Sequence, residues 1–193
     1  MTDKDDLPTR EFASAKDFEK WLSAEHTSSA GIWLKIARKT SGVESVDYSQ
    51  ALDVALCYGW IDGQKDKFDD DHWLQRFTPR KQTSKWSQVN RQRAEDLVKA
   101  HKMRPAGQAE IDRAKADGRW DAAYASQKTA GVPDDLQQAL DEDQKAKDFF
   151  ATLDSKNRYA VLYRIGDAKK PETRAARIKK YVAMLHDHEK IHP

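Results

Sequence analysis

The chain has 193 residues, of which 38% are hydrophobic and 34% charged, and its formal net charge at neutral pH is +2. This length fits one domain, or a domain with a smaller one appended, and is enough to bury a hydrophobic core. No apolar run approaches the roughly 20 residues of a membrane helix, and the first residues lack the basic start and apolar core of a signal peptide. Cys57 is the only cysteine, which excludes an intramolecular disulfide and a cysteine-clustered zinc site. We therefore expect a cytoplasmic protein that has no membrane partner.

The first elements predicted are a helix and a strand. Ser14 followed by Asp17 is typical of a helix start, and apolar side chains at spacings of three and four predict a helix over about residues 15–26. Residues 31–39, GIWLKIARK, alternate with the period of a half-buried strand. This is the strongest strand pattern in the chain.

A second helix and a β-hairpin are predicted next. Asp47 and Gln50 match a capping box, and the helix that follows should end at Gly59, because glycine takes the left-handed C-cap conformation without steric cost. Two short segments, WIDGQKDKF (residues 60–68) and HWLQRFT (residues 72–78), flank a run of three aspartates. Together they predict two strands joined by an acidic turn.

A further pair of helices is predicted after the hairpin. Ser84 or Ser87 can cap the first of them. Its apolar stripe would consist of Val89, Ala94, Leu97 and Val98. The Arg-Pro-Ala-Gly segment at residues 104–107 should break this helix, and the next should run over about residues 108–117.

The apolar pattern lapses between residues 125 and 133, which predicts a boundary or linker. Beyond it, four apolar stripes at helical spacing predict a helical module whose last helix opens at Pro171. The predicted fold class is therefore α+β. A small antiparallel sheet packed by helices is expected over residues 1–128, followed by a helical C-terminal module over residues 129–193.

Basic and aromatic residues concentrate in residues 57–107. From Arg76 to Arg104 there are nine Lys or Arg residues against two acids, so the basic charge is segregated in a chain whose net charge is only +2. Aromatic rings beside arginines and amides suit a small anion or a planar ligand. The candidate ligand-binding residues are Trp60, Asp62, Trp73, Gln75, Arg76, Arg80, Trp86, Asn90 and Arg104.

The strand that carries Trp73 has two mixed faces. Trp73 and Gln75 share one face, and Arg76 lies on the other. If the first face is buried, Gln75 needs hydrogen-bond partners; if the second is buried, Arg76 must be paired, because an unpaired buried charge is very costly. Asp62 on the neighbouring strand is the natural partner. An ion pair between Asp62 and Arg76 fits the pattern as well as a ligand-binding role does.

The sequence contains no familiar catalytic motif: GxSxG, HExxH, CxxC and a glycine-rich phosphate loop are all missing, and we expect no cofactor. The aspartates that begin at Asp62 do not match an EF-hand, because Lys67 stands where that loop needs glycine. A solvated acidic turn is the preferred interpretation.

Cys57 and three histidines near the end of the chain are also candidates for chemistry. We interpret Cys57 as a buried structural thiol rather than a reactive one, because a reactive thiol needs a nearby cation or helix N-terminus. His186, His188 and His192 are potential metal ligands, but they lie in a polar terminal segment that should fray. No metal site is predicted.

Five blocks of sequence occur in one order along the chain: CYGWIDG (57–63), LQRFTPRK (74–81), WSQVNR (86–91), MRPAG (103–107) and AKKPETRAARIKKYV (168–182). In these blocks the chain resembles the YdeI/OmpD-associated family, a bacterial group named for bacteriocin protection. The resemblance extends from about Phe12 to Leu185. It implies a role in bacterial stress or bacteriocin tolerance, and it implies no substrate, cofactor or catalytic residue.

Three functional hypotheses follow from these observations. The first is a small anionic or aromatic ligand, bound between tryptophan walls by arginine donors. The second is a nucleic-acid partner, with the basic segment of residues 76–104 against phosphates and a tryptophan stacked on a base. The third is an enzyme in which Asp62, beside the arginines, is the general base. The sequence predicts no oligomeric state.

Overall fold

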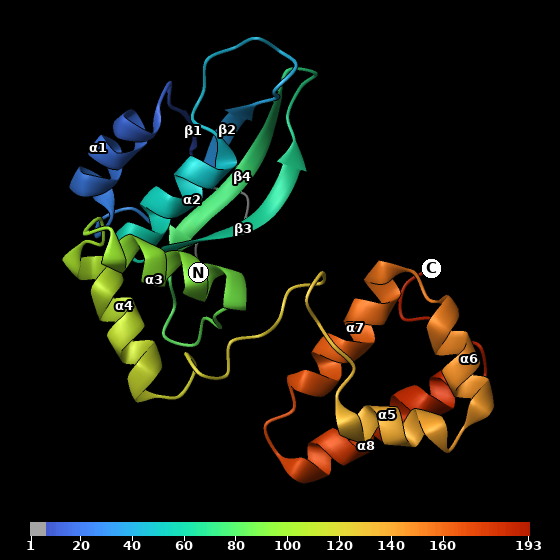
Figure 1. Ribbon diagram of the computed structural model, residues 1–193. Helices are drawn as coiled ribbons and strands as arrows, with labels where there is room; N and C mark the ends of the chain where they lie inside the picture. Colours follow the sequence, from blue (N-terminus) through green and yellow to red (C-terminus); the bar gives the residue numbers. More distant parts are fainter. Residues whose placement is uncertain (1–6) are drawn as a thin grey trace. The chain divides into compact units, whose positions relative to one another are not determined.

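The computed structural model describes residues 7–193 (Figure 1). The chain divides into two compact units. The first contains the residues up to Trp86 together with Asn90–Ala122, and the second contains Ser87–Val89 and Ala123–Pro193. The first unit has a sheet and helices, and the second is helical, so the predicted α+β class is confirmed.

A four-stranded sheet with the order β1-β2-β4-β3 lies at the centre of the first unit. Its strands are β1 (Thr9–Glu11), β2 (Ile32–Ala37), β3 (Trp60–Lys67) and β4 (His72–Pro79). β2, β4 and β3 pair antiparallel as predicted, whereas β1 runs parallel to β2. The sheet is therefore mixed rather than wholly antiparallel. The sequence did not predict β1, because three residues that are all exposed give no alternating pattern.

Two helices of the first unit begin where their capping residues predict. α1 (Ala15–Glu25) follows Ser14, whose side chain accepts a hydrogen bond in the first turn. α2 (Tyr48–Cys57) starts with the predicted capping box, in which Asp47 and Gln50 bind each other's backbone N–H groups. Both helices lie on the same side of the sheet (Figure 1). Their fully or almost fully buried side chains pack with those of the sheet to form the core: Phe18, Leu22, Leu52, Leu56, Ile32, Leu34 and Phe77.

The next two helices differ from the prediction in one detail each. In α3 (Gln88–Lys99), Val89 and Val98 are 46% and 39% exposed, so half of the expected apolar stripe faces solvent. α4 (Pro105–Ala116) begins inside the segment at residues 104–107 that was expected to separate the two helices, rather than at about residue 108. Pro105 takes the first helical position, where its fixed φ and missing N–H cost nothing.

The second unit contains the four predicted helices. They are α5 (Asp134–Asp141), α6 (Gln144–Thr152), α7 (Ser155–Gly166) and α8 (Pro171–His186). Their buried side chains form a core of their own, which includes Leu136, Leu140, Phe150, Val161, Ile165 and Leu185. None of the helices between residues 7 and 193 is long and apolar enough to cross a membrane.

The three C-terminal histidines have separate partners. His186 Nδ1 lies 2.8 Å from the Asp143 carboxylate, the ring of His188 stacks on that of Phe149, and a buried asparagine of α7 binds the backbone of His192. The expectation of a frayed tail is wrong, because these contacts hold the segment against the helices. Within the described part of the chain, no group of three or more His, Cys, Asp or Glu side chains is arranged to hold a metal ion.

Candidate functional site

The pairing of β4 with β2 decides which face of β4 is buried. Gln75 lies opposite Leu34, which is fully buried, so both side chains share the face that the helices cover. Gln75 itself is 0% exposed. Arg76 lies opposite Trp33 on the other face, where both side chains are half-buried. Of the two arrangements that the sequence allows, the one that forms therefore buries Gln75 and leaves Arg76 on the other face.

The buried Gln75 amide stabilises an irregularity in β3. The register of β3 against β4 shifts between Asp62 and Lys65, which is the mark of a β-bulge. Gln75 Nε2 donates to the carbonyl oxygens of Gly63 at 2.9 Å and Gln64 at 3.2 Å. The side-chain amide thus binds backbone groups that lie inside the bulge. The amide donor thus has the partners that burial requires, whereas the buried Gln75 Oε1 has no hydrogen-bond partner among the described residues.

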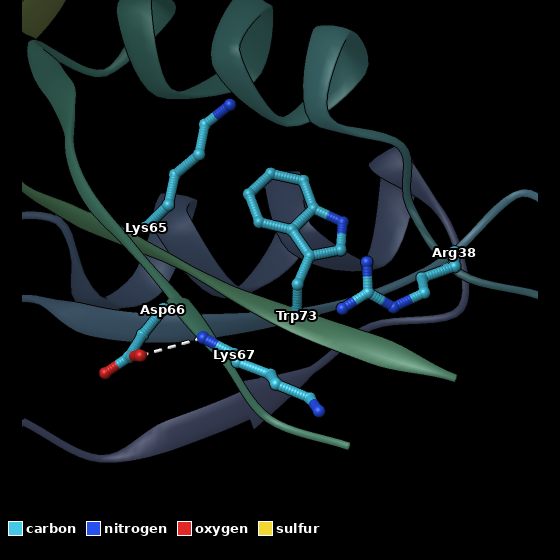
Figure 2. Close-up of a pocket in the computed structure, with 5 residues that line it drawn as sticks. All are labelled: Arg38, Lys65, Asp66, Lys67 and Trp73. Atoms are coloured by element: carbon cyan, nitrogen blue, oxygen red, sulfur yellow. Dashed lines mark hydrogen bonds between the residues drawn. The ribbon is translucent and has the colours of Figure 1, made fainter. Parts of the chain in front are cut away.

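The bulge changes the face on which Lys65 lies. Strict alternation from Asp62 would place Lys65 on the uncovered face of the sheet, but the shifted register aligns it with Gln75 on the covered face. Figure 2 shows Lys65 and Trp73 extending side by side from one side of the strands, with Asp66 on the other side. Bulges often re-aim a side chain next to a functional site.

A hollow of about 390 Å³ lies where β3 ends and β4 begins, and we call it the Trp73 hollow. Its lining residues are Arg38, Lys65, Asp66, Lys67 and Trp73 (Figure 2). The Trp73 ring lies 6.0 Å from the ring of Tyr48. Lys65 Nζ lies 5.2 Å from the centre of the Trp73 ring and 5.4 Å from that of Tyr48. Lys65 and Arg38 therefore lie on the same side as a partly exposed indole, whereas Lys67 borders the hollow and extends to the side of Asp66 (Figure 2).

Tyr48 is fixed by Asp62. Its hydroxyl donates to Asp62 Oδ2 at 2.8 Å. Burial, followed by the charge of Asp62, raises the pKa of Tyr48 above its ordinary value of 10, so that the phenol remains a protonated donor. The ion pair between Asp62 and Arg76, one of the two alternatives that the sequence left open, does not form. Asp62 lies opposite Phe77 on the covered face, whereas Arg76 lies on the other face of the sheet.

Two of the predicted tryptophan walls are core residues. Trp60 is 1% exposed, its indole N–H donates to the carbonyl of His26 at 3.1 Å, and its ring meets that of Trp21 edge to face. Trp86 is 2% exposed and lies under the Arg80 guanidinium, whose carbon is 3.5 Å from the centre of the ring. Neither tryptophan lines the Trp73 hollow.

The remaining candidates also lie apart from the Trp73 hollow. Arg104 pairs with Glu19 at 2.7 Å and borders two other hollows of the first unit. Asn90 is half-buried in α3. Of the nine candidates, Trp73 lines the Trp73 hollow and Asp62 holds the tyrosine beside it. Sequence reasoning missed Lys65 because alternation places it on the wrong face, and it missed Tyr48 because that residue comes from a helix distant in sequence.

Cys57, the last residue of α2, is 6% exposed. Burial, followed by the nearby charges of Glu19 and Asp53, raises the pKa of its thiol to about 11. The thiolate is therefore scarce at neutral pH. This environment agrees with the interpretation of Cys57 as a structural thiol.

We expect Cys57 to react with methyl methanethiosulfonate about 100-fold more slowly at pH 8 than a thiol with the ordinary pKa of 9, since each pKa unit removes about tenfold of the thiolate. The rate should keep rising with pH toward about 11. Labelling rates measured across the alkaline range test this. The urea-unfolded chain is the control, because its rate should level off near pH 9. A native rate that levels off there too would contradict the raised pKa.

The chain is thus an α+β protein with a cationic, aromatic hollow where β3 ends and β4 begins. Residues 10–110, just over half of the chain, match the family model described as Domain of unknown function (DUF8412), and the chain belongs to that family. Residues 129–188 match the model described as Bacteriocin-protection, YdeI or OmpD-Associated, which confirms the family resemblance over the helical module. Searches of curated proteins and of solved structures found no match.

The two matches divide the sequence blocks on which the resemblance was based. The block at residues 168–182 lies inside the YdeI/OmpD-associated match. The four blocks between residues 57 and 107 lie inside the match to the domain of unknown function. The Trp73 hollow therefore belongs to the part of the chain whose family description names no activity.

Proposed function

We propose that the protein binds a small planar anion in the Trp73 hollow. The observation that supports this most directly is the Lys65 ammonium, 5.2 and 5.4 Å from the centres of the Trp73 and Tyr48 rings. Arg38 and Lys67 add two further cationic side chains to the same hollow. A carboxylate or phosphate of the ligand would face these cations while its ring lies against the indole.

The size and chemistry of the hollow support a small molecule. Its volume of about 390 Å³ falls within the roughly 300–1,000 Å³ of small-molecule sites. Asp66, the one acid in its lining, extends from the other side of the strands, where its carboxylate accepts the backbone N–H of Lys67 at 2.8 Å (Figure 2). Lys67 extends to the same side as Asp66 (Figure 2), so the charge on the Trp73 side of the hollow comes from Lys65 and Arg38 and is positive.

A nucleic-acid partner receives less support, because arginines of the basic segment are engaged within the protein. Arg80 covers the Trp86 ring, Arg93 pairs with Asp53 at 2.6 Å, and Arg104 pairs with Glu19. Guanidinium groups held in this way are less available to phosphates. Asp62 as a general base has no specific observation in its favour, since its described contact positions Tyr48.

For the whole chain we propose a ligand-binding role in bacterial stress or bacteriocin tolerance, in the cytoplasm. The description of the family model that matches residues 129–188 supports the link to bacteriocin tolerance, the Trp73 hollow supports ligand binding, and the composition supports the cytoplasmic location. The expected ligand is anionic and aromatic.

We expect aromatic carboxylates or nucleoside monophosphates to raise the melting temperature of the protein, because a ligand that binds only the native state stabilises it. Replacing Trp73 by alanine should weaken the binding of such a ligand by about tenfold or more, since stacking on an aromatic ring contributes ~1–3 kcal/mol. Lys65→Gln should weaken it by roughly fivefold. Calorimetric titration of each variant measures both effects.

Two matched variants serve as controls for this experiment. Phe68→Ala removes another exposed ring of the same hairpin, and Lys20→Gln removes a lysine of α1; neither residue lines the Trp73 hollow, so both should leave the affinity unchanged. Trp73→Phe keeps a ring and should retain most of the binding. The proposal fails if none of these probes binds, or if Trp73→Ala and Lys65→Gln bind like wild type. A salt-sensitive shift with single-stranded oligonucleotides alone would favour nucleic acid.

A further inference from the structure

A second hollow in the first unit has a different lining. It has a volume of about 470 Å³ and lies where α1, α2 and the C-terminal end of α3 meet; we call it the α1–α3 hollow. Its lining includes Lys16, Val54, Cys57, Leu97, His101 and Lys102. It shares no lining residue with the Trp73 hollow.

The charges around the α1–α3 hollow do not cancel. Both of its acids have arginine partners, because Glu19 pairs with Arg104 and Asp53 pairs with Arg93. Lys16 and Lys102 have no ion-pair partner among residues 7–193. Lys16 is also the second residue of α1, and the N-terminal end of a helix favours an anion. The rim of the hollow is therefore suited to a negatively charged group.

Beneath this rim the lining is apolar. Leu97 and Cys57 are 8% and 6% exposed, and Val54, which also lines the hollow, is half-buried. A neutral buried thiol behaves as a small hydrophobic group. The hollow thus combines an apolar floor with a cationic rim, which suits a ligand that has an apolar chain and one anionic end.

His101 provides an independent observation at the same hollow. α3 ends in a Schellman motif, because the N–H of His101 binds the carbonyl of Val98 and the N–H of Lys102 binds that of Leu97. In this motif the residue at the His101 position is left-handed, with a φ of 56°, where glycine is favoured and other residues are strained. Glycine at this position would relax the backbone, whereas the His101 side chain borders the hollow.

α8 also ends in a Schellman motif with a histidine at the left-handed position. His188 has a φ of 59°, and the N–H groups of His188 and Glu189 make the two corresponding hydrogen bonds. The ring of His188 stacks on that of Phe149, with centres 4.9 Å apart, which accounts for a side chain there. The exposed His101 side chain has no such contact within the described residues, and the feature it borders is the α1–α3 hollow. Strained positions of this kind concentrate at functional sites.

We propose that the α1–α3 hollow is a second binding site, which takes a small organic anion with an apolar chain, such as a medium-chain carboxylate. The carboxylate lies between Lys16, His101 and Lys102, and the chain lies on Val54, Leu97 and Cys57. The site is separate from the Trp73 hollow and does not depend on the function proposed there.

Octanoate is the probe that tests this site. We expect it to raise the melting temperature and to slow the labelling of Cys57 by methyl methanethiosulfonate at least fivefold at saturation, because the bound chain covers the thiol. Lys16→Gln and Lys102→Gln should each weaken octanoate binding about fivefold. Octylammonium, which has the same chain and the opposite charge, should bind at least tenfold more weakly than octanoate.

His101→Gly separates a role in binding from a role in the fold. Glycine removes the left-handed strain, so the melting temperature without ligand should stay the same or rise, while octanoate binding weakens at least fivefold. Lys20→Gln in α1 and Lys99→Gln in α3 remove the same charge outside the lining and should change the affinity less than twofold.

Several results would overturn the proposal: no octanoate binding to the wild-type chain, equal binding of octylammonium, or unchanged affinity in both Lys16→Gln and Lys102→Gln. Trp73→Ala should leave octanoate binding unchanged. The two sites therefore fail or succeed independently. If octanoate binding is lost in Trp73→Ala but kept in the lysine variants, the anion binds at the Trp73 hollow and the second site is absent.

Discussion

Replacing Gln75 by glutamate is expected to lower the free energy of unfolding of the first unit by about 3–5 kcal/mol at neutral pH. Gln75 is 0% exposed, and its amide N–H groups bind two carbonyl oxygens of the β3 bulge. A carboxylate has the same shape but no donor, so its charge would be buried against those carbonyls without a partner. Denaturant unfolding followed by tryptophan fluorescence measures the effect, because all six tryptophans precede Ala123 and report on the first unit.

The loss of unfolding free energy in Gln75→Glu should grow with rising pH. Burial raises the pKa of the introduced carboxyl above its unfolded value of about 4.3, so the folded state binds the extra proton. The difference from wild type is therefore smallest below that unfolded value and grows as the pH rises through and above it. Gln64→Glu makes the same change at an exposed bulge residue and should stay within about 0.5 kcal/mol of wild type. Equal effects of the two substitutions would show that Gln75 is not the buried donor described here.

Replacing Gly107 by alanine is expected to destabilise the first unit by about 2–3 kcal/mol, although alanine is the better helix former. Gly107 lies inside α4, where that helix contacts the end of α2. A Cβ atom built there would lie 2.5 Å from the carbonyl oxygen of Leu56 and closer still to that of Cys57. Both are backbone atoms, so the clash is relieved only by moving one helix away from the other.

Ala109→Gly in the same helix is the matched comparison. Ala109 is exposed, so this change tests helix propensity alone and should cost about 0.5–1 kcal/mol. If propensity governed both positions, Gly107→Ala would stabilise the protein by a similar amount. Tryptophan fluorescence and helical circular dichroism during denaturant unfolding distinguish the two signs. A stabilised Gly107→Ala variant would contradict the close contact between α4 and α2.

The contact of Gly107 with the end of α2 also lies beside the α1–α3 hollow. Cys57 lies in the lining of that hollow, and Arg104, the N-cap of α4, lies there too. A displacement of α4 from α2 would therefore change the position of the Arg104 guanidinium relative to Glu19, which now lie 2.7 Å apart. The tight contact at Gly107 helps to fix one wall of the site.

Elements with local signals could be predicted from the amino-acid sequence alone. The capping box of Asp47 and Gln50, the strand at residues 32–37 and the four C-terminal helices were all predicted, because helix caps and apolar periodicity act over a few residues. The fold class follows from these elements. The basic and aromatic character of residues 57–107 was equally visible, and Trp73 was among the candidates.

Which of those residues lie together depends on strand pairing and packing, which the sequence pattern did not reveal. Asp62 and Arg76 are both on paired strands, yet they lie on opposite faces, and a one-residue bulge places Lys65 beside Trp73 where alternation predicts the reverse. Trp60 and Trp86 lie in the same basic and aromatic region as Trp73, but they are buried in the core. The reason is that the side-chain period of a strand is two, so a single inserted residue changes the face of every residue that follows it.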